Sequence, residues 1–221
     1  MDDSGIRKLA FRARWARALA LAYLVTIVLN LAASGIFQWL AASPENLAMA
    51  HSPGLVIALG IVNIATIFLT LALTVLYLMW LYRACANMAA TSSAPLRFSP
   101  GWTVGSHFVP LVNLVIPFLA MRQLYNRSMG EDPDLANASV PDVASWWACV
   151  IAGNLIQLFL MTIALLNQIP RLYVMTPKAL DLVMMVLGPV LLMAATWFLY
   201  RIIGAITDAQ QSYAHIGSTF E

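Results

Sequence analysis

The sequence has 221 residues, of which 61% are hydrophobic and 10% are charged, and its formal net charge is +2. A soluble domain carries about 25% charged residues, so this composition excludes a water-soluble globular protein and indicates a multi-pass helical membrane protein. The basic residues stand at the ends of apolar segments instead of forming one patch, so we expect no nucleic-acid partner. The two cysteines, Cys85 and Cys149, form no CxxC motif and no disulfide framework.

Four apolar segments reach the roughly 20 residues that a helix needs to cross a bilayer. The basic N-terminal residues before the first segment resemble a signal peptide, but the apolar character continues to Ala42, which favours a retained span. We therefore predict an all-α fold, with one membrane domain over residues 1–221 built as a four-helix bundle. The predicted spans are about 18–42, 54–82, 145–166 and 180–203.

Between the second and third spans lies an apolar stretch, residues 97–125, that does not read as a regular transmembrane helix. Its prolines remove backbone donors, and non-helical backbone is tolerated in lipid only where protein covers it. We predict two short helical pieces, broken near Pro110, that form a re-entrant or interfacial element over 101–121. The residues expected to shape this broken segment are Pro100, Gly101, Gly105, Pro110 and Pro117.

The distribution of basic residues predicts which side of the membrane each end faces. If the N-terminus is cytoplasmic and the broken segment returns to its own side, only Arg171 and Lys178 of the 12 basic residues lie outside. The bias is weaker if the segment crosses. The motifs WLYR at 80–83 and WFLYR at 197–201 also look like matching interface anchors, which makes their spans parallel. We therefore expect both termini in the cytoplasm.

Several motifs resemble those of a known family: WLYRACAN at 80–87, RFSPGWTVGSHFVPLVNLVIPFLAMRQLY at 97–125, SWWACVIAGNLI at 145–156 and ITDAQ at 206–210. Over roughly residues 75–210 the chain resembles the bacterial domain-of-unknown-function family numbered 4328. His107 departs from the family pattern, in which an aromatic or other apolar residue is expected. The resemblance implies a bacterial membrane protein, and it implies no activity. We expect that membrane to be the cytoplasmic (inner) membrane.

The sequence offers little for catalysis or cofactor binding. The histidines, His51, His107 and His215, are far apart in sequence, and the 11 methionines show no MxxM pattern, so we expect neither a metal nor a haem. The spans contain almost no ionisable residue, which argues against a proton-coupled pump and an intramembrane protease. We expect no enzyme activity and no cofactor.

Amide side chains within the apolar segments need partners, because an unpaired amide is costly in lipid. We predict that Asn113 and Asn154 bond around the broken segment, where prolines free carbonyl groups. Asn87 and Gln210 are expected to be structural in the same way.

Four arginines gather near the predicted cytoplasmic face, beside Trp102. They are Arg83, Arg97, Arg122 and Arg127. One interpretation is anchoring at the membrane interface, as expected for basic and aromatic residues near span ends. The other is a basic groove that binds anionic lipid headgroups or the acidic surface of a partner.

Two functional hypotheses stay open. The leading one is a non-enzymatic scaffold, sensor or regulatory subunit that works through contacts with membrane lipids, a protein partner or further copies of itself. The alternative is a small oligomeric transporter or channel whose broken segment lines the pathway, because broken helices at membrane depth are a transporter device.

Overall fold

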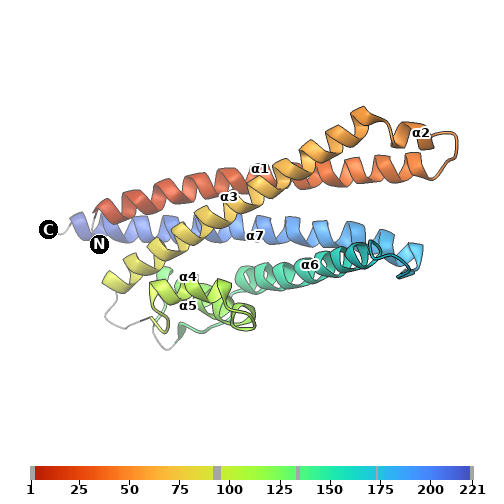
Figure 1. Cartoon of the computed structure of the whole chain (residues 1–221). Coiled ribbons are helices and arrows are strands. Elements are labelled where there is room, and N and C mark those ends of the chain that lie inside the picture. The colour runs from red at the N-terminus through yellow and green to blue at the C-terminus, as the bar shows by residue number, and fades with distance from the viewer. Residues whose placement is uncertain (1–2, 92–95, 133–134, 173, 220–221) are drawn as a thin grey trace.

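The computed structural model (Figure 1) describes residues 3–91, 96–132, 135–172 and 174–219. The described chain is helical and contains no strand, which confirms the predicted all-α fold. Four of its helices are long and apolar enough to cross a membrane, so the chain is a multi-pass membrane protein. These helices are α1 (Asp3–Ala41), α3 (Pro53–Thr91), α6 (Pro141–Leu166) and α7 (Lys178–Thr219), and a short α2 (Leu47–Ala50) joins α1 to α3.

The four long helices match the four predicted spans to within one residue at the end of α1, but three of them extend well beyond the spans. α1 and α3 have 39 residues each, about 58 Å of helix, whereas the hydrocarbon core of a bilayer is about 30 Å thick. The extra turns lie at the end of the bundle that carries both termini, called here the terminal end (Figure 1). The opposite end, with α2 and the α6–α7 connection, is called the loop end.

Burial separates the two halves of the bundle. The most apolar 18-residue window of α3 has a mean hydropathy of 2.5 and none of it is buried, as expected for a surface that contacts lipid. The packed core lies instead toward the terminal end, where α1, α3, α5, α6 and α7 meet. This terminal core includes Leu9, Ala13, Ala16, Trp80, Leu81, Ala84, Met121, Leu124, Val143, Trp146, Ile202, Ile203 and Ile206.

The broken segment folds as two helical pieces, as predicted. α4 (Pro100–Gly105) continues into the 3-10 helix η1 (Ser106–Phe108), and η2 (Val112–Leu114) continues into α5 (Ile116–Ser128). The two pieces bend by 111° at residues 109–111. α3 ends and α6 begins toward the terminal end, so the segment enters and leaves on one side of the bundle (Figure 1).

Only one of the residues expected to shape the break lies in it. Pro110 sits at the bend, next to Leu111, whose φ is 65°. Pro100 and Pro117 lie in the first turns of α4 and α5, where a missing N–H leaves no helical hydrogen bond unmade. Gly101 and Gly105 lie within α4.

The predicted role of Trp80 as an interface anchor is wrong. Its side chain is fully buried in the terminal core, and its indole N–H donates to Thr207 Oγ1 at 3.0 Å. The reason is that α1 and α7 continue past the predicted spans and cover this face of α3. Trp197 of the second motif is half exposed and stacks on Tyr200, as an anchor would. The predicted parallel course of α3 and α7 is nevertheless what the structure shows (Figure 1).

Candidate functional site

A cavity of about 610 Å³ lies where the broken segment meets α3, α6 and α7. α3 packs on α1 and α6 packs on α7, and the cavity occupies the space between these two pairs, next to the turn of the broken segment. We call it the segment cavity. Its lining consists of Thr74, Tyr77, His107, Asn113, Leu114, Trp146, Trp147, Val150, Ile151, Asn154, Leu155, Leu158 and Leu199.

One wall of the segment cavity is a chain of polar contacts between α3 and the broken segment. His107 Nδ1 lies 3.0 Å from the Thr103 carbonyl oxygen, which can only accept, so this nitrogen carries the proton and donates. In the neutral ring Nε2 is then an acceptor, and the Tyr77 hydroxyl donates to it at 3.1 Å. The Tyr77 oxygen keeps its capacity to accept a hydrogen bond from a molecule in the cavity.

Two amides also line the segment cavity. The Asn113 side chain makes no hydrogen bond within the described chain, so its donors and its acceptor are available. Asn154 donates to the Val150 carbonyl of its own helix at 2.8 Å and is exposed. The hydrogen bond expected from Asn154 to the broken segment is made by Trp147 instead, whose indole N–H donates to the Leu114 carbonyl at 2.9 Å.

The cavity changes character along its length. Tyr77 lies five residues inside the end of its predicted span, which is about 8 Å of helix, and Asn154 lies about 14 Å inside the start of its own. Beyond Asn154 the lining is aliphatic, with Leu155 and Leu158. None of the described lining residues is Lys, Arg, Asp or Glu. The site therefore offers uncharged hydrogen-bonding groups at one end and an apolar wall at the other.

The predicted structural amides Asn87 and Gln210 meet in the terminal core. Gln210 is fully buried and donates to the Ala84 carbonyl at 3.2 Å and to Ser128 Oγ at 3.0 Å. Asn87 Nδ2 donates to Gln210 Oε1 at 3.4 Å. One side chain of α7 thus joins α3 to the end of α5. This network holds the base of the broken segment.

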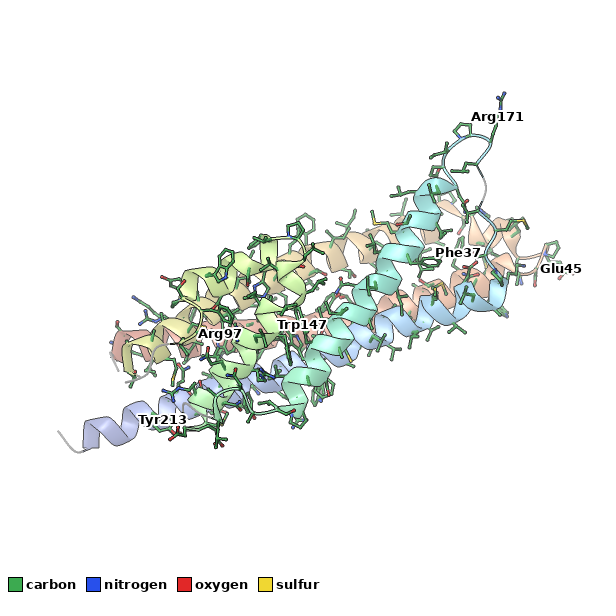
Figure 2. The ribbon with its side chains drawn as sticks, turned by 90° about the horizontal axis from the view of Figure 1, so that it is seen from below. Phe37, Glu45, Arg97, Trp147, Arg171 and Tyr213 are labelled. Atoms are coloured by element: carbon green, nitrogen blue, oxygen red, sulfur yellow. The ribbon has the colours of Figure 1, made fainter. Side chains whose placement is uncertain are left out.

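The four predicted groove arginines and Trp102 lie in different surroundings. Arg83 is half-buried and donates to the Gly5 carbonyl on α1 at 3.3 Å. Arg97 is exposed, and Arg122 lies over the Phe118 ring. Arg127 Nη1 donates to the Glu131 carbonyl at 3.3 Å. Trp102 is half exposed on α4. Figure 2 shows Arg97 near the terminal end and Arg171 at the loop end, as the charge bias predicts. A shared basic groove stays a prediction.

Among the described residues no group of three or more His, Cys, Asp and Glu side chains could hold a metal ion. His215 lies outside the residues whose side chains are described. Cys85 is buried and Cys149 is half-buried, and both thiols are free.

The sequence reasoning missed two of the principal residues of the site. Tyr77 carried a usable signal, because a phenol within a lipid-crossing helix needs a hydrogen-bond partner. Trp147 and its neighbour Trp146 follow the start of a predicted span, a position that is typical of interface residues. In the structure the Trp147 ring lies between the broken segment and the body of the bundle (Figure 2), where it bonds the Leu114 carbonyl. This contact depends on the position of the broken segment, which the sequence does not give.

Comparison with known proteins gives a family and no activity. No curated protein and no solved structure matches the chain. A family model described as a domain of unknown function, DUF4328, matches residues 48–208. The match begins before α3 and ends within α7, so it contains the broken segment, the segment cavity and most of the buried amide network. The chain therefore belongs to the DUF4328 family.

Proposed function

We propose that this protein holds a membrane lipid in the segment cavity and acts without catalysis, as a scaffold, sensor or regulatory subunit of a bacterial cytoplasmic membrane. The observation that carries the proposal is the cavity itself. Its volume of about 610 Å³ lies in the usual range of ligand sites, roughly 300–1,000 Å³. Its uncharged polar end and apolar wall match the glycerol ester region and an acyl chain of a lipid.

The polar groups are placed to orient such a lipid. The free Asn113 amide can donate to an ester carbonyl, and the Tyr77 oxygen can accept from a hydroxyl. The acyl chain would then lie along Leu155 and Leu158, deeper in the bilayer. Because the cavity lining contains no charge, the charged headgroup would remain outside it, at the membrane surface.

The broken segment gives this site a regulatory character. His107 and Asn113 form part of the cavity wall, so an occupant of the cavity would contact the segment directly. The segment is hydrogen-bonded to α3 through Tyr77 and to α6 through Trp147. A change of occupant would act on these two bonds and shift the exposed turn at 108–111.

Lipid retention tests the proposal. The protein in nanodiscs of defined lipid is transferred to detergent, and the retained lipids are counted by native mass spectrometry. Leu155→Trp fills the cavity, and Met161→Trp is its matched control, since the two side chains are 60% and 61% exposed and only Leu155 lines the cavity. We expect Leu155→Trp to retain one lipid fewer than the natural protein and the control, which should retain equal numbers.

A second variant separates filling from anchoring. Asn113→Leu removes the free amide and leaves the space, so we expect retention to fall roughly tenfold, as for the loss of one buried hydrogen bond. Equal retention in Leu155→Trp and Met161→Trp would overturn the proposal, and so would a natural protein that retains no lipid.

A second candidate function, transport, is favoured by a different cavity. A space of about 250 Å³ lies among the four long helices in the membrane half, and polar side chains such as Asn30, Asn63 and Gln157 line part of it. An adjoining space of about 210 Å³ shares Ser34, Asn63 and Met185 with it and reaches Gln38, toward the loop end. Pro189 lies within α7 and leaves the Met185 carbonyl without its helical donor. The broken segment does not line this space.

Cysteine accessibility tests the transport candidate. In a background with Cys85 and Cys149 replaced by Ser, Ser34→Cys is treated with a charged, membrane-impermeant thiosulfonate, and Val28→Cys serves as the lipid-facing control. Labelling of Ser34→Cys alone from outside the cell supports a hydrated vestibule. Equal protection of both positions would count against transport.

A further inference from the structure

A further cavity, of about 420 Å³, lies between α1 and α7 at the terminal end, away from the segment cavity. Its side chains come from two antiparallel helices at the level where the predicted spans of both helices end (Figure 1). We call it the headgroup cavity. It is lined by Ala10, Ala13, Arg14, Arg17, Ala18, Leu21, Tyr200, Thr207, Asp208 and Gln211.

Arg17 is held in place within this cavity. Its guanidinium lies over the Tyr200 ring, with Cζ 4.3 Å from the ring centroid. It also packs on Gly204, where an added Cβ would come within 3.3 Å of Cζ. Its Nε is buried and has no hydrogen-bond partner within the described chain. A guanidinium fixed by stacking, with an unused buried donor, is prepared to bind an oxyanion.

Two further charges stand beside Arg17. Arg14 lies three residues earlier on α1, on the same helix face, and it forms no ion pair in the described part of the chain. Asp208 of α7 faces the same cavity, and its carboxylate also has no ion-pair partner among the described residues. The cavity therefore offers two cationic groups and one anionic group.

The order of these groups along the helices matches the order of groups in a phospholipid. Leu21 and Ala18 lie on the membrane side, Arg17 and Arg14 follow, and Asp208 and its neighbours lie nearest the aqueous phase. We propose that the headgroup cavity binds a zwitterionic phospholipid of the phosphoethanolamine type. Arg14 and Arg17 hold the phosphate, Asp208 receives the ammonium group, and the acyl chains leave past Leu21 into the bilayer.

The choice of a zwitterionic headgroup follows from Asp208. An anionic lipid without an ammonium group would place its negative charge near the unpaired Asp208 carboxylate. The ammonium group of an ethanolamine headgroup would instead neutralise that carboxylate. Replacing the carboxylate therefore changes which lipid is preferred. The headgroup cavity shares no lining residue with the segment cavity, so a substitution can abolish lipid binding in one cavity without affecting the other.

Competition between two lipids tests the inference. The full chain in detergent, in its natural form and with Leu155→Trp filling the segment cavity, is mixed with equal amounts of phosphatidylethanolamine and phosphatidylglycerol of different acyl mass. Native mass spectrometry counts the bound lipids, and the Leu155→Trp arm counts those of the headgroup cavity alone. We expect a preference for phosphatidylethanolamine in the natural protein. Arg17→Gln should weaken its binding roughly tenfold, whereas Arg7→Gln, an exposed position on the same helix that does not line the cavity, should not.

Asp208→Asn keeps the shape of the site and decides the headgroup. We expect it to invert the preference toward phosphatidylglycerol while the melting temperature stays that of the natural protein. The inference is overturned if Asp208→Asn leaves the preference unchanged, or if Arg17→Gln binds lipid as Arg7→Gln does. It is also overturned if inorganic phosphate alone gives the same Arg17-dependent rise in melting temperature as the lipid, which would make this a site for free phosphate.

Discussion

Replacing Gln210 by Met gives the sharpest stability prediction. The two side chains are similar in length, but Met removes the amide that joins Asn87, Ser128 and the Ala84 carbonyl. The Ala84 carbonyl keeps its bond within α3, so its loss costs little. The Asn87 amide and the Ser128 hydroxyl are 5% and 0% exposed, and both lose a partner that water cannot replace.

The expected magnitude follows from these two orphaned groups. A buried polar group left unsatisfied costs about 1–3 kcal/mol. The Asn87 contact is long, at 3.4 Å, so its share belongs at the low end of that range. The total is about 2–4 kcal/mol, which corresponds to a fall in melting temperature of roughly 5–15 °C for a chain of this size.

Thermal unfolding in detergent, followed by circular dichroism, measures this effect. The control is Gln211→Met, the same change at the next position, where the side chain is exposed. A further arm combines Asn87→Leu with Gln210→Met, and the double variant should lose less than the sum of the single losses, because both partners are then removed. The reasoning is refuted if Gln210→Met melts within 2 °C of Gln211→Met.

Three further predictions concern the helices around the segment cavity. Trp147→Phe keeps a ring but removes its N–H bond to the broken segment, so amide exchange over 106–116 should become about fivefold faster, and unchanged exchange would contradict this. Asn154→Leu should shift the melting temperature by less than about 2 °C, because the Asn154 side chain is exposed and bonds only its own helix. A fall above about 5 °C would show that the Asn154 amide has a partner on another helix. Gly153→Val should destabilise the protein by about 1–3 kcal/mol, because an added Cβ comes within 2.9 Å of Leu192 on α7. Gly60 has open space around it, so the Gly60→Val control should melt at a higher temperature than Gly153→Val.

The spans and the broken segment could be predicted from sequence because lipid imposes simple rules. A helix of about 20 apolar residues is the stable way to cross a bilayer, so composition alone identifies α1, α3, α6 and α7. Pro110 marked the bend for an equally local reason, the missing backbone donor. The same rule applied to Pro100 and Pro117 failed, because a proline in a first turn begins a helix as readily as it interrupts one.

The site itself depends on tertiary packing that sequence does not carry. The helices continue beyond the membrane and form the terminal core, which changes Trp80 from an interface residue into a buried one. α3 and α6 each pack on a different partner, and the segment cavity arises from that separation. Asn113 was recognised as a polar residue that needs a partner, but only the structure shows that its amide faces an open space.

A cryo-electron microscopy map of the protein in lipid nanodiscs tests the central claim most directly, because it shows what occupies the segment cavity. We predict an elongated density between α3 and α6, with its polar end beside Asn113 and its length along Leu155 and Leu158. Direct contact between α3 and α6 that closes the cavity, or a cavity that holds only water, would contradict the account.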